Sequence, residues 1–557
     1  MSTPVAERGS ARPRGGGIGR AAVLIGAITM LARVIGFGRQ VVFAHTVQAS
    51  CLGAAYTTAN MVPNIIYDIV LGGALTAVVV PVLAGPARAV GARGQSADAD
   101  RAQVRQISAA LLSWAVLLLV PVSLVVAAIA RPLVSVLLGA TPGCPRADMV
   151  TLAARMLVVF APQILLYGLA VVLYGILQAH RRFAAPALAP VLSSLVVIGA
   201  YFWFGVVGNG YQDLTRPVPA LAWIVLAAGT TAGVAALVVT PLIPAARLRL
   251  RLRLRPALRF PPGIGARVRA LAAAGVATLI AQDASVAVVI VLANSRGGSG
   301  ALVLYSFAWA VFFVPYAVLT VPIATSAFPE LSARATSPGT GSFDSTSATS
   351  TRAVTVASWL GVAGMAGTCV PLARVFQSHV SQAADARQLA IALAAFAPGL
   401  VGYGLTANLS RVLYAEGSKG RSRASALAVS GGWILVIVAD LLIVPFVPRS
   451  AVVPWLGAGT TLGLTGSGVA LLFLVRRFRG PDALRGCARA TLAGLAGAVA
   501  ATAAGLGVSA AVRPVGFLPN VGVTLLASAA VLVAFLAVVA VADGGDLRAV
   551  TRKVVRL

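Results

Sequence analysis

The sequence predicts an all-α polytopic membrane protein, and its composition and its pattern of apolar runs carry this prediction. Of the 557 residues, 59% are hydrophobic and only 11% are charged. Long apolar runs recur along the chain and are separated by short polar segments, and a helix needs about 20 apolar residues to cross a bilayer. Because irregular backbone cannot face lipid, each long run should form a helix.

About fourteen such spans are expected, and Pro and Gly within them predict kinks. The kinks are expected at Pro63, Gly72, Gly73, Pro162, Pro315 and Pro322. The spans are expected at 21–45, 53–84, 106–130, 150–177, 184–206, 218–244, 268–294, 300–328, 353–375, 388–414, 425–446, 451–475, 490–512 and 520–542.

The basic charge is explained by membrane topology. The net charge is +29, which alone would suggest a nucleic-acid partner. However, Lys and Arg concentrate in every second loop, and the loops between hold only Arg131, Arg146, Arg216, Arg296, Arg374, Arg387, Arg449 and Arg513. This asymmetry predicts a multi-pass protein of the cytoplasmic membrane with both termini in the cytoplasm, and it removes the reason to expect nucleic-acid binding. The N-terminal apolar core resembles a signal sequence, but it continues through Arg33 without a convincing cleavage site, so it is taken as the first span.

An internal repeat divides the spans into two lobes. The segments "YGLAVVLYGILQA" (167–179) and "YGLTANLSRVLYA" (403–415) lie in the fourth and tenth spans. An even number of spans separates them, so both should run in the same direction, as in transporters built from parallel repeats with a substrate path between the halves. We expect two six-helix lobes followed by two C-terminal helices.

The expected organisation has seven parts. They are a cytoplasmic tail (1–20), an N-lobe of spans one to six (21–244), a basic cytoplasmic linker (245–267), a C-lobe of spans seven to twelve (268–475), a second cytoplasmic linker (476–489), spans thirteen and fourteen (490–542) and a cytoplasmic tail (543–557).

Two polar segments are expected on the cytoplasmic side. Arg recurs at every second position from 247 to 255, a period that fits an extended strand. This segment either lies on anionic lipid headgroups or is a solvated linker. The Ser/Thr-rich stretch 335–352 predicts a flexible loop.

Enzymatic motifs are not found, and the protein is not expected to be an enzyme. The three histidines are scattered, and no phosphate-binding glycine loop or nucleophile elbow occurs in a strand-to-helix context. The four cysteines have no metal-ligand spacing, so no firm metal site is predicted. Cys51 and Cys144 fall in separate external loops and could pair, but we expect them to be small unpaired residues.

Two arginines inside the first span are the leading candidates for function. A charged residue at the bilayer centre costs roughly 2.5–3.5 kcal/mol on insertion scales, so it normally faces a cavity or a partner. Viewed down the helix axis, Arg33 lies about 60° to one side of Gly36 and Arg39 about 60° to the other. The two arginines are about 9 Å apart along the axis. This arrangement leaves room for a wide anion, and guanidinium suits phosphate. The alternative is that they pair with an acid such as Asp68.

Two further acids lie deep in the spans. Asp283 and Asp440 could hold Na⁺ or H⁺ together with hydroxyls of the twelfth span, with Thr461 as the chosen candidate beside Thr460 and Thr465. The alternative is that each is a structural, hydrogen-bonded carboxyl group. Arg155 and Arg411 lie near span ends, where long side chains reach the interface.

Three segments resemble a known family. "ARVIGFGRQVVFA" (32–44), "ANMVPNIIYDIVLGGALTAVVVPVLAG" (59–85) and "GILQAHRRFAAPALAPVLSSLVVIG" (175–199) resemble the MurJ/MviN lipid II flippases of the multidrug/oligosaccharidyl-lipid/polysaccharide exporter superfamily. The resemblance covers spans one to twelve. Only two of the 44 basic residues are lysines, which is similar to high-GC Gram-positive relatives.

The resemblance implies a function in peptidoglycan biosynthesis. Lipid II is a polyprenyl diphosphate carrying a disaccharide-pentapeptide, and the family moves its headgroup across the cytoplasmic membrane, which cell-wall biogenesis and cell shape require. Family arginines that face a cationic cavity correspond to Arg33 and Arg39. We therefore predict a lipid II flippase working by alternating access, with substrate-binding residues Arg33, Gly36, Arg39, Asn64 and Asp68. No cofactor is expected beyond a coupling Na⁺ or H⁺.

Several charged positions of the family differ here. Relatives commonly carry an acid at the position of Gln40 and another at the position of Ala54. They commonly have two arginines where this chain has Tyr67-Asp68, and a Glu where it has Gly72. They have Asp-Arg where it has Trp309-Ala310. The cavity therefore loses arginines and acids together. Two alternatives stay open: a flippase for another polyprenyl-diphosphate oligosaccharide, or a non-transporting scaffold that recruits cell-wall synthesis or division proteins.

Overall fold

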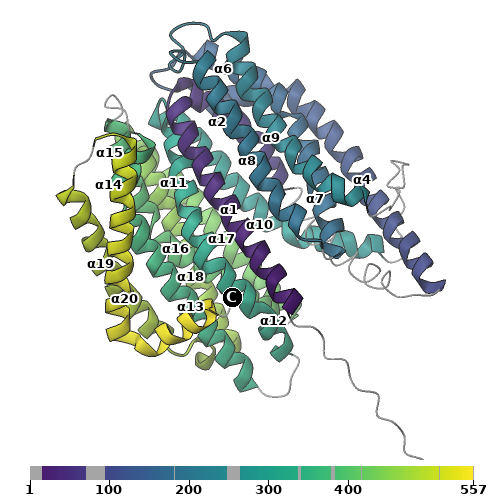
Figure 1. Ribbon diagram of the computed structural model, residues 1–557, viewed down its shortest axis with the longest axis vertical. Helices are drawn as coiled ribbons and strands as arrows, with labels where there is room; N and C mark the ends of the chain where they lie inside the picture. Colours follow the sequence, from purple (N-terminus) through teal and green to yellow (C-terminus); the bar gives the residue numbers. More distant parts are fainter. Residues whose placement is uncertain are drawn as a thin grey trace, which may run out of the picture.

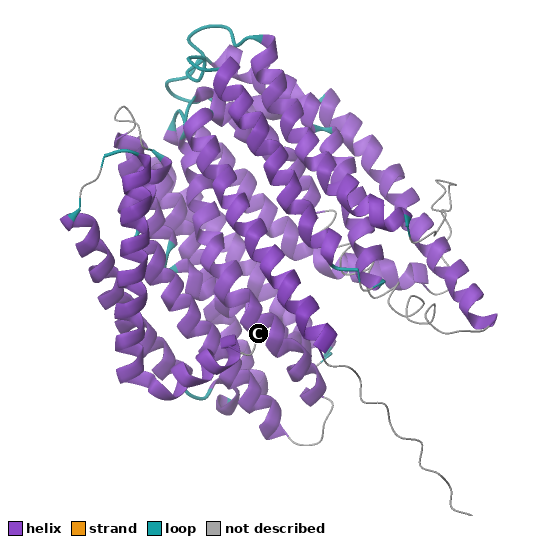
Figure 2. Cartoon of the chain, viewed as in Figure 1, coloured by secondary structure: helices purple, strands orange, loops and turns teal. Residues whose placement is uncertain are grey.

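The computed structural model describes residues 16–69, 95–180, 182–247, 264–335, 340–377, 383–415, 417–512 and 515–555. Within these ranges all regular structure is helical, and no strand occurs (Figure 2). The predicted all-α membrane fold is confirmed.

The helices of the first half run from α1 to α9. Their bounds are α1 Gly16–Thr46, α2 Cys51–Tyr67, α4 Gln95–Ala128, α5 Ala130–Leu138, α6 Arg146–Phe160, α7 Pro162–Ala179, α8 Ala184–Val207 and α9 Ala220–Ala246. The second half contains α10 Ile264–Leu292, η2 Ala293–Gly297, α11 Ala301–Pro315, η3 Tyr316–Thr320, α12 Val321–Ala335, α13 Thr340–Gly367, α14 Cys369–Phe376, α15 Ala383–Phe396, α16 Gly399–Ala415, α17 Lys419–Ile443, η5 Val444–Phe446, η6 Arg449–Ala451, α18 Val452–Arg479, η7 Pro481–Leu484, α19 Cys487–Ala511 and α20 Phe517–Val555.

Among the described residues, eleven helical segments are long and apolar enough to cross a membrane, or up to thirteen if each of two bent helix pairs is one span. These pairs are α13 with α14, bent by 61°, and α15 with α16, bent by 41°. The thirteen coincide in order with thirteen of the expected spans. The expected second span, 53–84, begins in α2 and leaves the described residues at position 70, so the count of fourteen stays a prediction.

The prolines that the sequence singled out lie at helix ends in some cases and inside helices in others. Pro63 lies inside α2, and Pro162 is the first residue of α7, directly after α6 ends. Pro315 ends α11, and the π-helical turn η3 follows it, while Pro322 lies in the first turn of α12. A π-helical turn changes the helix register locally and often lies where a helix must adapt to function. The glycines at 72–73 lie outside the described residues.

The helices pack in two groups that meet along α1, α2 and α11 (Figure 1). In the first group α8 packs on α1 and α9, and α7 packs on α4 and α9. In the second group α18 packs on α15, α16 and α17, and α13 packs on α16, while α19 and α20 pack on each other and on α13. The groups touch where α11 contacts α1 and α2, and where α5 contacts α10. The two repeat segments occupy equivalent places, because Ala179 ends α7 and Ala415 ends α16.

The prediction of a flexible loop at 335–352 is wrong from Thr340 onward, because α13 begins there. Its hydroxyl groups bond to carbonyls one turn back, as Thr349 does to Ser345 at 2.8 Å and Thr351 to Ser347 at 2.7 Å. Hydroxyl groups satisfied in this way allow a Ser/Thr-rich segment to remain helical when its neighbours bury it. Composition alone does not report this burial.

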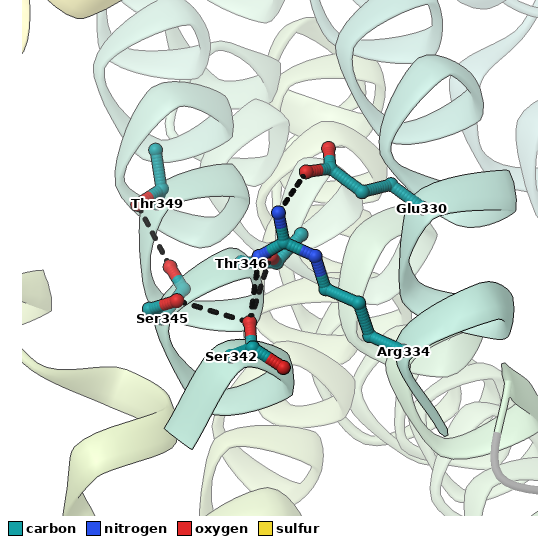
Figure 3. A network of polar contacts seen from close by, with 6 residues as sticks. All are labelled: Glu330, Arg334, Ser342, Ser345, Thr346 and Thr349. Carbon is teal, nitrogen blue, oxygen red and sulfur yellow. Dashed lines mark hydrogen bonds and ion pairs between the residues drawn. The ribbon is translucent and has the colours of Figure 1, made fainter. Parts of the chain in front are cut away.

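Arg334 of α12 ties the start of α13 to the preceding helix (Figure 3). Its guanidinium donates to the Ser342 carbonyl oxygen at 2.8 Å and to the Thr346 hydroxyl, and it forms an ion pair of 2.7 Å with Glu330. A second pair joins Arg479 of α18 to Asp344 at 3.1 Å. The helical start of α13 is thus held from two neighbouring helices.

The expectation that Cys51 and Cys144 are unpaired is wrong. They form a disulfide that joins the first residue of α2 to the turn before α6, with the two Cα atoms 5.7 Å apart. The two residues are 93 positions apart in the chain, so only the packing of α2 on α6 brings them together. Cys369 and Cys487 are not in disulfides.

The basic linker 245–267 is described only at its two ends. Its first residues end α9, and residues from Ile264 onward begin α10. The predicted extended strand of alternating arginines lies outside the described residues.

Candidate functional site

A cavity of about 690 Å³ lies where the two groups of helices meet. Its walls come from α1, α2, α7, α8 and α9 on one side and from α11 on the other. A pocket between two packed helix groups is a common place for a ligand site. This cavity is therefore the candidate functional site.

The predicted face of α1 lines this cavity. Arg33, Gly36 and Arg39 are all in its wall, with Arg33 exposed and Arg39 half-buried. A Cβ atom added at Gly36 would meet nothing within 4 Å, so the space between the two guanidinium groups is open at this position. The helical geometry expected from the sequence is confirmed.

Arg33 and Arg39 are the only charged side chains among the described residues that line the cavity. Asp68 follows the end of α2 outside this lining, and no ion pair joins it to either arginine within the described chain. The Cζ atom of Arg33 instead lies 5.1 Å from the centre of the Phe313 ring, a distance typical of a cation–π contact. The described part of the cavity wall thus carries a positive charge without an acidic partner, which suits an anion.

Asn64 also lines the cavity, and hydrogen bonds fix its side chain. Its Oδ1 atom accepts a bond of 2.9 Å from the Tyr167 hydroxyl, and its Nδ2 donates to the Asn60 carbonyl oxygen at 2.9 Å. Asn64 therefore links α2 to α7 within the cavity wall. A direct role in ligand binding stays a prediction.

Aromatic side chains close one end of the cavity. The Phe43 ring lies 5.4 Å from the Tyr56 ring and 6.0 Å from the Phe307 ring of α11. The Tyr56 hydroxyl bonds to Tyr201 at 2.9 Å and to Thr230 at 2.7 Å. These side chains are buried, with at most 5% exposure, so they seal the cavity between the two helix groups.

Backbone contacts continue this seal beyond the aromatic side chains. Gly300 precedes α11 with φ of +77°, and a Cβ added there would lie 2.3 Å from the carbonyl oxygen of Ala49. Only glycine allows the two chain segments to approach so closely. Nearby, Asn294 of η2 donates to the Thr58 hydroxyl at 2.9 Å and to the Leu137 carbonyl oxygen at 3.1 Å.

Asp440 of α17, a predicted cation ligand, lies outside this cavity. It is 1% exposed, and neither carboxylate oxygen has a hydrogen-bond partner within the described chain. Gly459 of α18 faces it, since a Cβ added at that glycine would lie 2.0 Å from Asp440 Oδ1. An unpaired buried carboxylate is costly, so it requires either a proton or a cation.

Asp283 and Thr461 are not brought to Asp440 as one site. The Thr461 hydroxyl donates to the carbonyl oxygens of Ala395 at 2.7 Å and Phe396 at 3.2 Å, so it is directed to α15. The hydroxyl of Ser430 in α17 bonds to Thr278 of α10 at 3.4 Å, so these two residues lie side by side. Asp283 lies five residues after Thr278, whereas Asp440 lies ten residues after Ser430. The two carboxyl groups are therefore offset by five residues, which is about 7.5 Å along the axes of these neighbouring helices. Asp283 Oδ2 also has no partner in the described chain.

A metal site built from several strong ligands is not found. No group of three or more His, Cys, Asp or Glu residues that could hold a metal lies within the part of the chain that the structure describes. A cation at Asp440 would therefore depend on one carboxylate with hydroxyl and carbonyl oxygens, the donors that hard cations prefer.

Tyrosines of the cavity are the residues that sequence reasoning missed. Six of the chain's ten tyrosines line it: Tyr56, Tyr67, Tyr167, Tyr174, Tyr201 and Tyr305. A partial signal was present, because Tyr167 and Tyr174 are seven residues apart in the repeat segment and therefore share one helix face. Their orientation toward the cavity depends on how α7 is rotated in the bundle.

Comparison with protein families gives a match over most of the chain. Residues 43–513 match the family model described as "Lipid II flippase MurJ". The matched range begins at Phe43, so Arg33 and Arg39 precede it.

Individual proteins with the same description are similar to the chain. The "Lipid II flippase MurJ" of Burkholderia cenocepacia is 27% identical over 474 residues, which are 83% of this chain and 84% of that protein. The "Probable lipid II flippase MurJ" of Rhizobium tropici is 25% identical over 311 residues, which are 56% of this chain and 54% of that protein.

Solved structures share the fold. "Lipid II flippase MurJ, inward closed conformation" superposes with a TM-score of 0.67 at 17% identity, covering 93% of this chain and 98% of that one. An inward-facing multidrug resistance MATE family transporter of the MOP superfamily superposes with a TM-score of 0.64 at 15% identity, covering 82% of this chain and 98% of that one. The helix arrangement is therefore that of this transporter fold.

Proposed function

The chain belongs to the lipid II flippase MurJ family, and on this premise we propose that it moves lipid II across the cytoplasmic membrane by alternating access. The observation that carries the site assignment is the pair Arg33 and Arg39, the only charged side chains among the described residues of the cavity wall. The proposed ligand of these two arginines is the diphosphate of lipid II.

The chemistry of the pair supports this assignment. Each guanidinium is a planar fork that forms two parallel, charge-assisted hydrogen bonds to phosphate oxygens. The open position at Gly36 lets a diphosphate lie between the two forks. Because no acid in the described lining competes for the arginines, their full charge is available to the ligand.

The orientation of the cavity follows from the charge distribution. Arg and Lys concentrate in the segments proposed to be cytoplasmic, which include both termini. The end of the cavity sealed by Phe43, Tyr56 and Phe307 then faces outward, and the headgroup enters from the cytoplasmic side. The polyprenyl tail stays in lipid while the headgroup occupies the cavity. Separation of the two helix groups at the seal releases the headgroup outside.

A cation bound at Asp440 is proposed to bias this cycle. Its two carboxylate oxygens have no partner in the described chain, so a proton or Na⁺ would satisfy them. Asp283 is proposed as a second titrating group on α10. Thr461 is the weaker candidate, since both of its hydrogen bonds go to α15.

The experiment is a flip assay with purified protein in liposomes containing labelled lipid II, with and without Na⁺ and a membrane potential. Arg39→Ala is expected to lower the rate by about tenfold or more, because bonds to charged groups contribute about 1.5–3 kcal/mol each. Arg155→Ala is the matched control, since Arg155 is exposed on α6 and outside the cavity.

Each alternative has its own outcome. A double Arg33/Arg39 alanine variant that flips lipid II at the normal rate would show that the arginine assignment is wrong. Wild-type protein that flips another polyprenyl-diphosphate oligosaccharide and not lipid II would identify a different substrate. Absence of any flipping, with growth of a depletion strain restored by the double variant, would favour a scaffold for cell-wall synthesis proteins.

A further inference from the structure

One wall of the cavity contains three tyrosines that are neither fully buried nor part of its aromatic seal. Tyr67 comes from α2, and Tyr167 and Tyr174 come from α7. We call these three residues the tyrosine wall. Each is half-buried. In contrast, Tyr56 and Tyr201 are 3% and 5% exposed, and their hydroxyl groups are hydrogen-bonded to each other. The tyrosine wall therefore presents aromatic surface to the cavity itself.

The rings of the tyrosine wall are held in place. Tyr167 and Tyr174 are seven residues apart, so they lie on one face of α7, about 10 Å apart along its axis. The Tyr67 ring lies 4.6 Å from the Tyr167 ring, with an angle of 47° between their planes. The Tyr167 hydroxyl donates to Asn64 Oδ1, which fixes the ring against α2. Two helices thus present aromatic rings along one side of the cavity, over a length comparable with that of two linked sugar rings.

Unused polar groups accompany this strip. The Tyr174 hydroxyl and the Asn60 Oδ1 atom have no hydrogen-bond partner among the residues that the structure describes. Both residues line the cavity. A buried polar group without a partner is unusual in a native protein and calls for an explanation such as a ligand. One hydroxyl and one amide oxygen next to aromatic rings match a ligand with both apolar and hydroxyl-bearing faces.

The chemistry of the wall differs from that of α1. No charged residue belongs to the wall, so it offers a phosphate no charge to pair with, while Asn60, Asn64 and the tyrosine hydroxyls make it too polar for a hydrocarbon tail. An aromatic face carries negative charge density and attracts the partly positive C–H groups of a sugar ring. The sugar hydroxyl and amide groups at the ring edge then meet the polar side chains.

We propose that the tyrosine wall binds the sugar portion of the diphosphate-linked lipid and makes the cavity selective for glycosylated over bare polyprenyl diphosphates. This inference rests on the proposed function, because the diphosphate at Arg33 and Arg39 places the adjoining sugars in the same cavity. The arginines supply affinity for every polyprenyl diphosphate, and the tyrosine wall supplies the preference among them.

The test measures the affinity of the purified full-length protein for three lipids with the same polyprenyl tail. They are the bare diphosphate, the diphosphate carrying the disaccharide, and the diphosphate carrying the disaccharide-pentapeptide. Tyr167→Ala and Tyr174→Ala are each expected to weaken binding of both glycosylated lipids by about three- to tenfold, the range of a single aromatic contact. Binding of the bare diphosphate lipid should change by less than about twofold on the same scale.

Two further variants separate the ring from its surroundings. Tyr167→Phe keeps the ring and removes only the bond to Asn64, so it should retain most of the preference for the glycosylated lipids. Tyr403→Ala is the matched control, because Tyr403 is the repeat equivalent of Tyr167, packs against Tyr316 with ring centres 4.1 Å apart and lies outside the cavity lining. It should leave the ratio of the affinities unchanged.

Several outcomes would overturn the inference. An equal loss for the bare and the glycosylated lipids would show that the tyrosines act only through the fold, and a loss confined to the lipid with the pentapeptide would assign the wall to the peptide. If Tyr167→Ala does not fold, Tyr174→Ala decides alone, since its hydroxyl bonds to nothing in the described chain. Failure of the proposed function is distinguishable, because Arg39→Ala would then leave the binding of all three lipids unchanged.

Discussion

Asn294 of η2 donates a 2.9 Å hydrogen bond to the hydroxyl of Thr58 in α2, and this bond joins the two helix groups beyond the sealed end of the cavity. The same amide donates to the Leu137 carbonyl oxygen at 3.1 Å. All of these groups are buried, and Asn294 and Thr58 are 0% exposed. Opening of the seal must therefore break two buried bonds that come from one side chain.

Asn294→Ala is expected to favour the conformation in which the sealed end is open. Loss of the amide leaves the Thr58 hydroxyl and the Leu137 carbonyl oxygen without this donor, at a cost of about 1–3 kcal/mol, or roughly five- to 150-fold in the equilibrium. The measurement is the distance distribution between spin labels at two exposed positions of this end, Ala147 and Ser450. Asn520→Ala is the control, because Asn520 is also buried but bonds only within its own segment, to Gly516. Unchanged distances in Asn294→Ala would show that the bond does not hold the seal.

Gly36→Leu is expected to block lipid II transport without unfolding the protein. A Cβ at this position meets nothing within 4 Å, so the fold has room for the side chain, but it then occupies the space between Arg33 and Arg39. Gly38→Leu is the matched control, since Gly38 has equally open surroundings and does not line the cavity. The flip rate and the thermal unfolding temperature are measured for both. Normal transport in Gly36→Leu would mean that the substrate does not pass between the arginines.

Replacing Cys51 and Cys144 with alanine is expected to lower the free energy of unfolding by about 2–4 kcal/mol, the typical contribution of a disulfide. The bond closes a segment of 93 residues and anchors the start of α2 beside α6. Thermal unfolding is measured with and without dithiothreitol. The reductant should destabilise only the wild-type protein, and an equal effect on the double variant would point to a different target.

Asp440→Asn is expected to remove the dependence of transport on the coupling cation. The neutral amide keeps the size of the side chain but loses the charge that a buried cation requires, and Asp440 is 1% exposed with two oxygens that lack partners in the described chain. Thr461→Val should leave that dependence intact, because its hydroxyl is already bonded to Ala395 and Phe396. Flip rates are compared across Na⁺ concentrations and pH values. A cation dependence lost in Thr461→Val and kept in Asp440→Asn would reverse the assignment.

Two ion pairs near the start of α13, one within α12 and one between α18 and α13, should differ in their contribution to stability. The Arg334–Glu330 side chains are 36% and 45% exposed, so Glu330→Ala, which leaves the bonds of Arg334 to Ser342 and Thr346 in place, is expected to cost at most about 1 kcal/mol. Arg479 and Asp344 are only 16% and 13% exposed, and Arg479 also lies 4.0 Å from the Phe343 ring centre. Arg479→Ala is expected to cost about 3 kcal/mol or more, because it leaves Asp344 without this partner in a buried place. Chemical denaturation of the two variants tests this order.

Local patterns predicted a large part of this protein. The apolar runs predicted thirteen spans that coincide with the described helices, and the spacing of Arg33, Gly36 and Arg39 predicted their shared face. Both features depend on the composition and periodicity of a single segment. The Ser/Thr-rich stretch failed as a predicted loop because its helix depends on burial by α12 and α18, which its own composition does not report.

The sequence by itself determined a multi-pass helical membrane protein with two arginines around an open glycine, because hydrophobicity and helical period act within each segment. The tertiary structure alone decided which side chains meet. It joins Cys51 to Cys144, keeps Asp68 out of the cavity lining, directs Thr461 to α15 and brings Tyr67 of α2 against Tyr167 of α7. These contacts depend on how each helix is rotated and placed against distant helices, and packing across the whole bundle fixes that rotation.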